Sequence, residues 1–146
     1  ETDAVIGGES SGGLTVRGHI KGKDGVYAAA LLVEMIAVTG KKLSVIMEEI
    51  QEKFGPGYMM EKDYRFEQLK KDEIQTILFI EKRLPELLWE IEKVSYLDGC
   101  KVYFKNGGWI ICRFSGTEPL LRIFCEMPEE KDILRAIHIF ESFFKL

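Results

Sequence analysis

Long apolar runs, paired cysteines and an excess of positive charge are all missing from this sequence. No apolar stretch approaches the roughly 20 residues of a membrane-spanning helix, and no charged-then-apolar signal peptide opens the chain. The three cysteines, Cys100, Cys112 and Cys125, lack C-x-x-C spacing and lie in or beside apolar runs. They predict small core residues of a reducing compartment, without a disulfide or a metal. With a net charge of −4 there is no basic stripe for nucleic acid. We therefore expect a cytoplasmic protein with neither a membrane nor a nucleic-acid partner.

The length and composition bound the number of domains. The 146 residues are 46% hydrophobic, which is enough for one domain or two small ones with real cores. The chain begins at Glu1 without an initiator methionine and enters an apolar strand pattern almost at once. We expect a piece of a longer protein, although simple processing would look the same.

The stretch Arg113-Phe-Ser-Gly-Thr-Glu-Pro119 interrupts two apolar runs, 109–112 and 123–125, that are typical of buried strands. It therefore predicts a polar loop between two strands. The loop combines two hydroxyls, a glycine and an arginine on either flank, the second being Arg122. Arginine forks, hydroxyls and free backbone N–H groups favour a phosphate dianion, because each supplies a donor or a positive charge. On spacing alone, a plain β-connection with solvated arginines is an equal alternative.

A second polar loop, 7–13, follows the apolar run 4–6 and has the sequence G-G-E-S-S-G-G. It has neither the G-K-[ST] of a Walker A loop nor the glycine spacing of a dinucleotide-binding loop. Glu9 and Ser11 offer a carboxylate and a hydroxyl on alternate residues, and a carboxylate accepts hydrogen bonds from two adjacent sugar hydroxyls. A flexible linker is the alternative, but linkers rarely join a buried strand directly to a helix.

Together these loops resemble those of the α-D-phosphohexomutases, which are the phosphoglucomutases, phosphomannomutases and phosphoglucosamine mutases. R-x-S-G-T-E-P, with an arginine three residues after the proline, is similar to the phosphate-binding loop in the last domain of that family. G-G-E-S-S-G-G is similar to its G-E-x-S-G sugar-binding loop, and residues 18–25 resemble the G-H-I-x-x-K-D-G segment of its glucose-preferring branch. Gly13 stands where many mannose- and glucosamine-type members carry histidine, so the resemblance implies a preference for glucose phosphates.

The resemblance also implies roles for single residues. Phosphate binding is assigned to Arg113, Ser115, Gly116, Thr117 and Arg122, and the reading of sugar hydroxyls to Glu9, Ser11 and His19. Lys23 becomes a positive group near the reacting phosphate, either as a general acid or base or as a phosphate contact. A hydrogen-bonded structural role is the alternative for His19. Asp24 is a predicted N-cap, which places Lys23 just outside a helix N-terminus, where an anion is favoured.

Members of the family move a phosphoryl group between the 1- and 6-hydroxyls of a hexose through a phosphoserine, with glucose 1,6-bisphosphate as activator or intermediate and Mg²⁺ as cofactor. The resemblance therefore implies an isomerase of carbohydrate metabolism that acts on a hexose phosphate. This sequence has no T-A-S-H-N-P-like serine segment and no D-x-D-x-D-R metal cluster. We expect the rest of the mutase chain to supply both, and these residues alone to be inactive.

Apolar periodicity predicts two units in an α+β chain. Residues 1–57 have one strand at 4–6 and helices over 26–37 and 43–54, which end at Gly55-Pro56-Gly57. Such a set cannot close a sheet, so it predicts the tail of an α/β domain. Residues 58–146 predict an antiparallel sheet covered by helices on one face. The predicted strands are 58–66, 94–97, 102–104, 109–113 and 120–126, and the helices are 129–144 and 72–91, the latter kinked or split at Pro85.

Two functions of other classes stay open at this point. A non-catalytic module that binds sugar phosphates or other anions would carry the same loops, but no serine or metal segment upstream. A nucleic-acid reader would stack bases on aromatic side chains of an open sheet face. The negative net charge and the absence of an aromatic pair flanked by basic residues argue against that reader.

Overall fold

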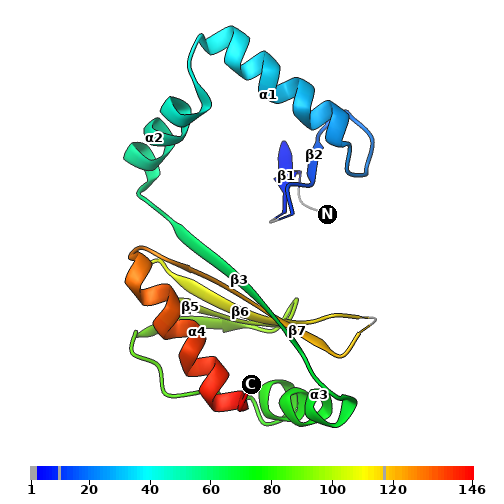
Figure 1. Ribbon diagram of the computed structural model, residues 1–146, viewed down its shortest axis with the longest axis vertical. Helices are drawn as coiled ribbons and strands as arrows, with labels where there is room; N and C mark the ends of the chain where they lie inside the picture. Colours follow the sequence, from blue (N-terminus) through cyan, green and yellow to red (C-terminus); the bar gives the residue numbers. More distant parts are fainter. Residues whose placement is uncertain (1–2, 10, 117) are drawn as a thin grey trace. The chain divides into compact units, whose positions relative to one another are not determined.

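The computed structural model describes residues 3–9, 11–116 and 118–146. The chain divides into two compact units, Glu1–Lys53 and Phe54–Leu146 (Figure 1). The sequence places the boundary slightly later, after Gly57.

The first unit opens with a β-hairpin. Strand β1 (Ile6–Gly8) pairs antiparallel with β2 (Leu14–Val16), with Gly7 opposite Thr15. The glycine-rich loop is therefore the turn of a hairpin, whereas the sequence predicts a loop from strand to helix. The second strand escapes prediction because three residues are too few to show alternation. Backbone bonds from Glu9 N to Gly13 O (3.1 Å) and from Gly12 N to Glu9 O (3.0 Å) close the loop.

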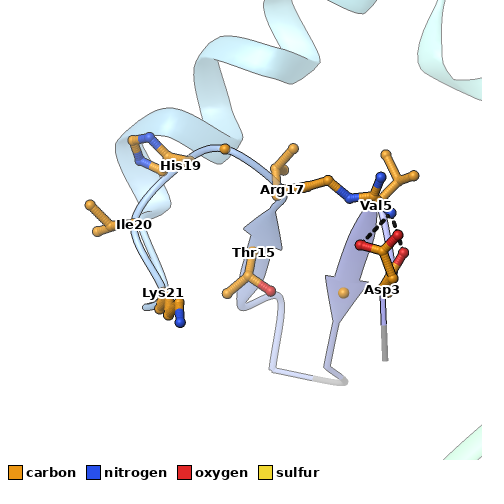
Figure 2. A pocket seen from close by; sticks show the side chains of 11 residues that line it. Asp3, Val5, Thr15, Arg17, His19, Ile20 and Lys21 are labelled. Atoms are coloured by element: carbon orange, nitrogen blue, oxygen red, sulfur yellow. Dashed lines mark hydrogen bonds and ion pairs between the residues drawn. The ribbon is translucent and has the colours of Figure 1, made fainter. Parts of the chain in front are cut away.

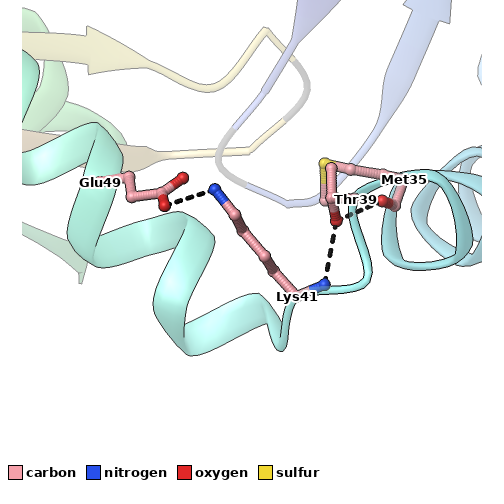
Figure 3. A network of polar contacts seen from close by, with 4 residues as sticks. All are labelled: Met35, Thr39, Lys41 and Glu49. Carbon is pink, nitrogen blue, oxygen red and sulfur yellow. Dashed lines mark hydrogen bonds and ion pairs between the residues drawn. The ribbon is translucent and has the colours of Figure 1, made fainter.

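Helix α1 (Gly25–Thr39) begins at the predicted N-cap. The Asp24 carboxylate accepts a hydrogen bond from the Tyr27 N–H at 3.0 Å, and the helix ends at Gly40 with a positive φ of 65°. The connection to α2 (Leu43–Phe54) is tied by polar contacts. Figure 3 shows the Thr39 hydroxyl donating to Met35 O (2.7 Å) and accepting from Lys41 N (3.3 Å), while Lys41 Nζ pairs with Glu49 Oε1 (2.5 Å).

The predicted apolar face of α1 is exposed. No residue of α1 is buried, and the side chains of Val26 and Val33 are 83% and 66% exposed. The described part of the unit contributes only the hairpin and α2 as other regular elements, and these leave the helix uncovered. Helices this apolar are typical of the interior of a larger domain.

The second unit is built on a five-stranded sheet with the order β3-β7-β6-β5-β4. Its strands are β3 (Tyr58–Arg65), β4 (Ile91–Ser95), β5 (Cys100–Phe104), β6 (Trp109–Phe114) and β7 (Leu120–Met127). All neighbouring strands run antiparallel. Figure 1 shows α3 (Gln68–Gln75) and α4 (Glu130–Phe144) on the same side of the sheet. The α+β architecture, with helices on one face of an antiparallel sheet, is confirmed.

The core lies between this sheet and its helices. Alternate residues of β5 are buried, and α4 contributes five buried side chains: Ile133, Ala136, Ile137, Phe140 and Phe144. All three cysteines are free and buried in this core, as predicted. Burial raises the pKa of the Cys100 thiol to about 11, because a thiolate is disfavoured away from water. The thiols are therefore packing groups rather than nucleophiles.

The helix predicted over 72–91 is shorter than expected. Helix α3 continues only into a π-helical turn, η1 (Thr76–Ile80), and residues 81–90 form no helix. Lys82 has a positive φ of 53°, which ends the helical conformation, and Pro85 cannot donate the backbone hydrogen bond that a helix interior requires. The apolar periodicity beyond Ile80 belongs to a loop whose Leu84 and Leu87 pack on the core.

A polar cluster joins α4 to β3 and makes stability pH-dependent. Glu141 accepts hydrogen bonds from the Tyr64 hydroxyl (2.5 Å) and from Lys62 Nζ (3.0 Å). The Tyr64 hydroxyl first, and then the Lys62 ammonium, hold the pKa of the Glu141 carboxyl below its ordinary 4.5. Since the folded-state pKa is the lower one, the ionised carboxylate contributes stability above pH 4.5, and this contribution is lost as the pH falls through the folded-state pKa.

We expect Glu141→Gln to lower the free energy of unfolding of the second unit by about 1 kcal/mol at pH 7. The difference from the wild type should shrink on acidification below pH 4.5. Urea titrations followed by tryptophan fluorescence measure it, with the exposed Glu86→Gln as the control. A difference that stays constant from pH 7 to pH 3 would contradict a role for the ionised carboxylate.

Candidate functional site

In the first unit, the hairpin loop brings Glu9 and Lys23 together. They line a cavity of about 280 Å³ with Gly7, Gly8, Gly13 and Thr15. Lys23 Nζ forms an ion pair with Glu9 Oε1. A side chain at position 13 would collide with this pair, because a Cβ there would lie 2.8 Å from Lys23 Cδ and closer still to the Glu9 carboxylate. Glycine at position 13 is therefore what allows the lysine and the carboxylate to meet.

His19 lines a different cavity, of about 470 Å³. Figure 2 shows it on the loop after β2, with Ile20 and Lys21, and shows the ion pair between Arg17 and Asp3 on the opposite side. His19 Nε2 lies 2.9 Å from Asp24 Oδ2, and its ring stacks on Tyr27 with a centroid distance of 3.9 Å.

The Asp24 carboxylate is shared between the helix and the histidine. The Tyr27 N–H, and then His19, lower the pKa of Asp24. The contacts of His19 are those of the structural alternative, and its role in sugar binding stays a prediction. Ser11 is exposed and lines neither of these two cavities.

In the second unit, the polar loop joins β6 to β7 as predicted. It borders a cavity of about 160 Å³ lined by Arg113, Phe114, Ser115, Gly116 and Arg122. Ser115 N–H donates to Leu120 O at 2.9 Å, and Ser115 Oγ accepts from Glu118 N at 3.4 Å. The backbone donor of Ser115 is thus used to close the loop, and its side-chain oxygen helps to order the turn. Thr117 lies outside the described residues.

The two arginines of the loop stand directly opposite each other. In the register of β6 and β7, Arg113 is the partner of Arg122, and both side chains are about half exposed. Arg113 Nε lies 3.1 Å from Asp98 Oδ1, and Arg122 Nε lies 3.6 Å from Asp63 Oδ1. Asp98 belongs to the turn between β4 and β5, and Asp63 to β3. Four charges therefore form a row across the open face of the sheet, in the order minus, plus, plus, minus.

A further cation near the loop comes from a helix. Lys71 of α3 places its Nζ 3.5 Å from Ser115 O and 6.0 Å from the centre of the Phe114 ring. Sequence reasoning missed this lysine, as it missed Asp63 and Asp98. Each is an ordinary charged residue in its local sequence, and only the strand and helix packing brings it to the loop.

The sequence showed no aromatic pair flanked by basic residues, but the open face of the sheet has one. Tyr103 and Trp109 are cross-strand partners, and Lys101 Nζ lies 4.8 Å and 3.8 Å from the centres of their rings. Lys93 Nζ lies 4.6 Å from the Tyr103 ring. An aromatic pair flanked by basic residues therefore exists, assembled by strand register rather than by adjacency in sequence. Its ring faces already carry lysine ammonium groups, so bases would have to displace them in order to stack.

Neither a metal centre nor a membrane span is found in the part of the chain that the structure describes. No group of three or more His, Cys, Asp or Glu side chains there is arranged to hold a metal ion. Among those same residues, no helix has both the length and the apolar character needed to cross a bilayer.

Two family models match separate parts of the chain. Residues 1–54 match the model of phosphoglucomutase/phosphomannomutase alpha/beta/alpha domain III. Residues 80–140 match the model of the phosphoglucomutase/phosphomannomutase C-terminal domain. The second match includes the Arg113 loop and the first includes the Glu9 loop.

Individual relatives are named as phosphoglucomutase/phosphomannomutase or as phosphoglucosamine mutases. A phosphoglucomutase/phosphomannomutase of Thermococcus kodakarensis is 33% identical over 131 residues, which are 90% of this chain and 26% of that protein. A phosphoglucosamine mutase of Methanococcus maripaludis is 34% identical, over 94% of this chain and 28% of its own length. A probable phosphoglucosamine mutase of Methanosarcina barkeri is 37% identical, over 90% and 27%. The chain thus spans about a quarter of the length of these relatives.

Similarity also extends to a solved structure. The crystal structure of a phosphoglucomutase/phosphomannomutase family protein from Burkholderia thailandensis superposes with a TM-score of 0.61 at 18% identity, over 95% of this chain and 27% of that one. At this identity the likeness concerns the fold alone.

Proposed function

Since this chain belongs to the phosphoglucomutase/phosphomannomutase family, we propose that it binds the hexose phosphate substrate as part of a mutase. Residues 1–54 match domain III of that family, and residues 80–140 match its C-terminal domain. Its part in that enzyme is to hold the sugar and a phosphate group. The phosphoryl transfer between the 1- and 6-positions then runs through a phosphoserine elsewhere in the mutase chain.

The observation that carries the proposal is the pair of arginines at the cavity beside the Ser115 loop. Two guanidinium groups and a hydroxyl border about 160 Å³. Cavities that take drug-sized ligands measure about 300 to 1,000 Å³, so this one favours a small anion. Arginine forks bind phosphate oxygens in pairs, and neither arginine side chain brings an acceptor that would repel them. Arg113, Ser115, Gly116 and Arg122, together with Thr117, are the proposed phosphate-binding residues.

Glu9, Ser11 and His19 are the proposed sugar-binding residues, and Lys23 the group near the reacting phosphate. Support comes from the Glu9–Lys23 ion pair at one cavity, because it places a carboxylate, which can accept hydrogen bonds from hydroxyls, beside a positive group. Gly13 permits this pair, and Gly13 is also the residue on which the proposed preference for glucose phosphates rests. Lys23 acts either in proton transfer or as a phosphate contact.

The remaining chemistry belongs to other parts of the enzyme. Mg²⁺ would neutralise charge on the transferring phosphoryl group, and glucose 1,6-bisphosphate would be the intermediate or activator. Because the described residues offer no metal-binding group, we assign none of them to Mg²⁺. Without an acceptor serine, the 146 residues alone are proposed to be inactive as an isomerase. We also propose that the enzyme works in the cytoplasm, in carbohydrate metabolism.

Phosphate titration of the ¹⁵N-labelled 146-residue chain tests the proposal. Inorganic phosphate and glucose 1-phosphate should both shift the backbone amide signals of Ser115 and Gly116, since both ligands carry the anion that the arginines bind. Sulfate should compete and glucose should not. If these amides stay unmoved while glucose 1-phosphate binds elsewhere, the assignment of the loop is wrong.

The sugar contact is tested separately, with Glu9→Gln. In the complete mutase we expect kcat/KM for glucose 1-phosphate to fall about tenfold to a hundredfold, because an amide replaces a charged acceptor. Phosphate binding to the 146-residue chain should be unchanged. Glu49→Gln, which removes a carboxylate of α2 that pairs with Lys41, is the control (Figure 3). Equal loss of turnover and of phosphate affinity would mean that Glu9 is structural.

A further inference from the structure

The charge row on the open sheet face poses a problem for the unliganded protein. Arg113 and Arg122 are direct cross-strand partners, and like charges in such positions destabilise a sheet. Neighbouring groups must therefore offset the repulsion between the two positive charges. Asp98 lies on the outer side of Arg113, and Asp63 on the outer side of Arg122.

The contact atoms show what the carboxylates do. Each aspartate forms an ion pair with its arginine, and the contact given for each pair is to Nε, at 3.1 Å for Arg113 and 3.6 Å for Arg122. A guanidinium has five N–H donors in a rigid plane, and only one of them is on Nε. Among the described residues, neither arginine side chain has an ion pair or hydrogen bond with any other residue. A carboxylate beside Nε restrains the guanidinium by charge and leaves the Nη edge for a second acceptor.

Both contacts lie at least partly in water. The Asp98 and Asp63 side chains are 68% and 46% exposed, and the arginines are about half exposed. Exposed ion pairs add little to folding stability. Their larger effect is on the freedom of the long arginine side chains, because a side chain that is ordered before binding loses less entropy when the ligand arrives.

We propose that Asp98 and Asp63 are positioning residues of the anion site, whose ion pairs beside Nε restrain Arg113 and Arg122 so that both Nη edges face one phosphate group. This inference rests on the proposed phosphate binding by the loop. It adds two residues, from the β4–β5 turn and from β3, that touch no ligand themselves. It also makes the sheet, rather than the loop alone, the support of the site.

Electrostatics alone predicts the opposite result. A carboxylate near an anion repels it, so removing Asp98 should tighten phosphate binding if the residue acts only through its charge. Removing a positioning residue should weaken binding, because the arginine must then be ordered by the ligand. The direction of the change in Kd therefore separates the two accounts.

Phosphate titrations of the 146-residue chain at low ionic strength make the test. We expect Asp98→Ala and Asp63→Ala each to raise Kd for inorganic phosphate about two- to fivefold, and the double variant about tenfold. Asp98→Asn keeps an acceptor oxygen at the same place and should recover part of the lost affinity. Glu81→Ala removes a carboxylate that pairs with Arg83 at 3.0 Å outside the site, and should leave Kd unchanged.

A spectroscopic readout addresses the arginines directly. In the ¹⁵N spectrum of the free chain, the Nε–H signal of Arg113 should move in Asp98→Ala and that of Arg122 should not, with the reverse for Asp63→Ala. Unchanged or tighter phosphate binding in both alanine variants overturns the positioning role. If phosphate fails to bind even to the wild type, or binds equally well to an Arg113→Ala variant, the proposed function fails instead.

Discussion

Replacing Arg113 and Arg122 together by alanine should weaken phosphate binding by the 146-residue chain about a hundredfold, because each charge-assisted hydrogen bond contributes roughly 1.5 to 3 kcal/mol and exposure reduces that figure. Arg113→Ala alone should cost about tenfold, and in the complete mutase it should lower kcat/KM for the sugar phosphate about tenfold to a hundredfold. Isothermal titration calorimetry and a coupled mutase assay measure these two effects.

Arg135→Ala is the matched control for the loss of positive charge. Arg135 lies on α4, on the helical side of the sheet, where it pairs with Asp132 at 3.3 Å. If net charge alone attracted phosphate, Arg135→Ala would weaken binding as much as Arg113→Ala. An equal effect of the two variants would show that the anion is held by the general field of the protein and not by the loop.

The second large effect concerns the core of the second unit. Phe140→Ala should destabilise this unit by about 3 to 5 kcal/mol, because the ring is 1% exposed and packs against Phe144, with a centroid distance of 5.9 Å. Leu134→Ala, on the same helix but 56% exposed, should change stability by less than about 0.5 kcal/mol. Urea unfolding followed by tryptophan fluorescence compares the two.

Phe140→Ala also separates folding from binding. At a urea concentration where the variant is still folded, its Kd for phosphate should equal that of the wild type, since Phe140 lies on the face of the sheet opposite to Arg113. A loss of stability as small as that of Leu134→Ala would mean that α4 does not cover the core. A change in Kd without unfolding would mean that the two faces are coupled.

Errors in the sequence prediction have local physical causes. The hairpin strand Leu14–Val16 is too short to show a period, and the apolar residues after Ile80 have helical spacing although Lys82 and Pro85 end the helix. The apolar face predicted for α1 exists as a pattern, but the described residues of the first unit have too few elements to bury it. In the last two cases the apolar spacing was present, but the structural context that it needed was not.

The amino-acid sequence by itself was enough to determine the α+β class, the buried cysteines, the Asp24 cap and the two polar loops. These depend on alternation, spacing and residue type within a few positions, which are local properties. The tertiary structure alone decided which charges meet. Strand register places Arg113 opposite Arg122 and gives each an aspartate at Nε, while α3 brings Lys71 to Ser115. The contacts with Asp98, Asp63 and Lys71 join residues well apart in the sequence, and they form only when the strands pair and the helices pack on the sheet.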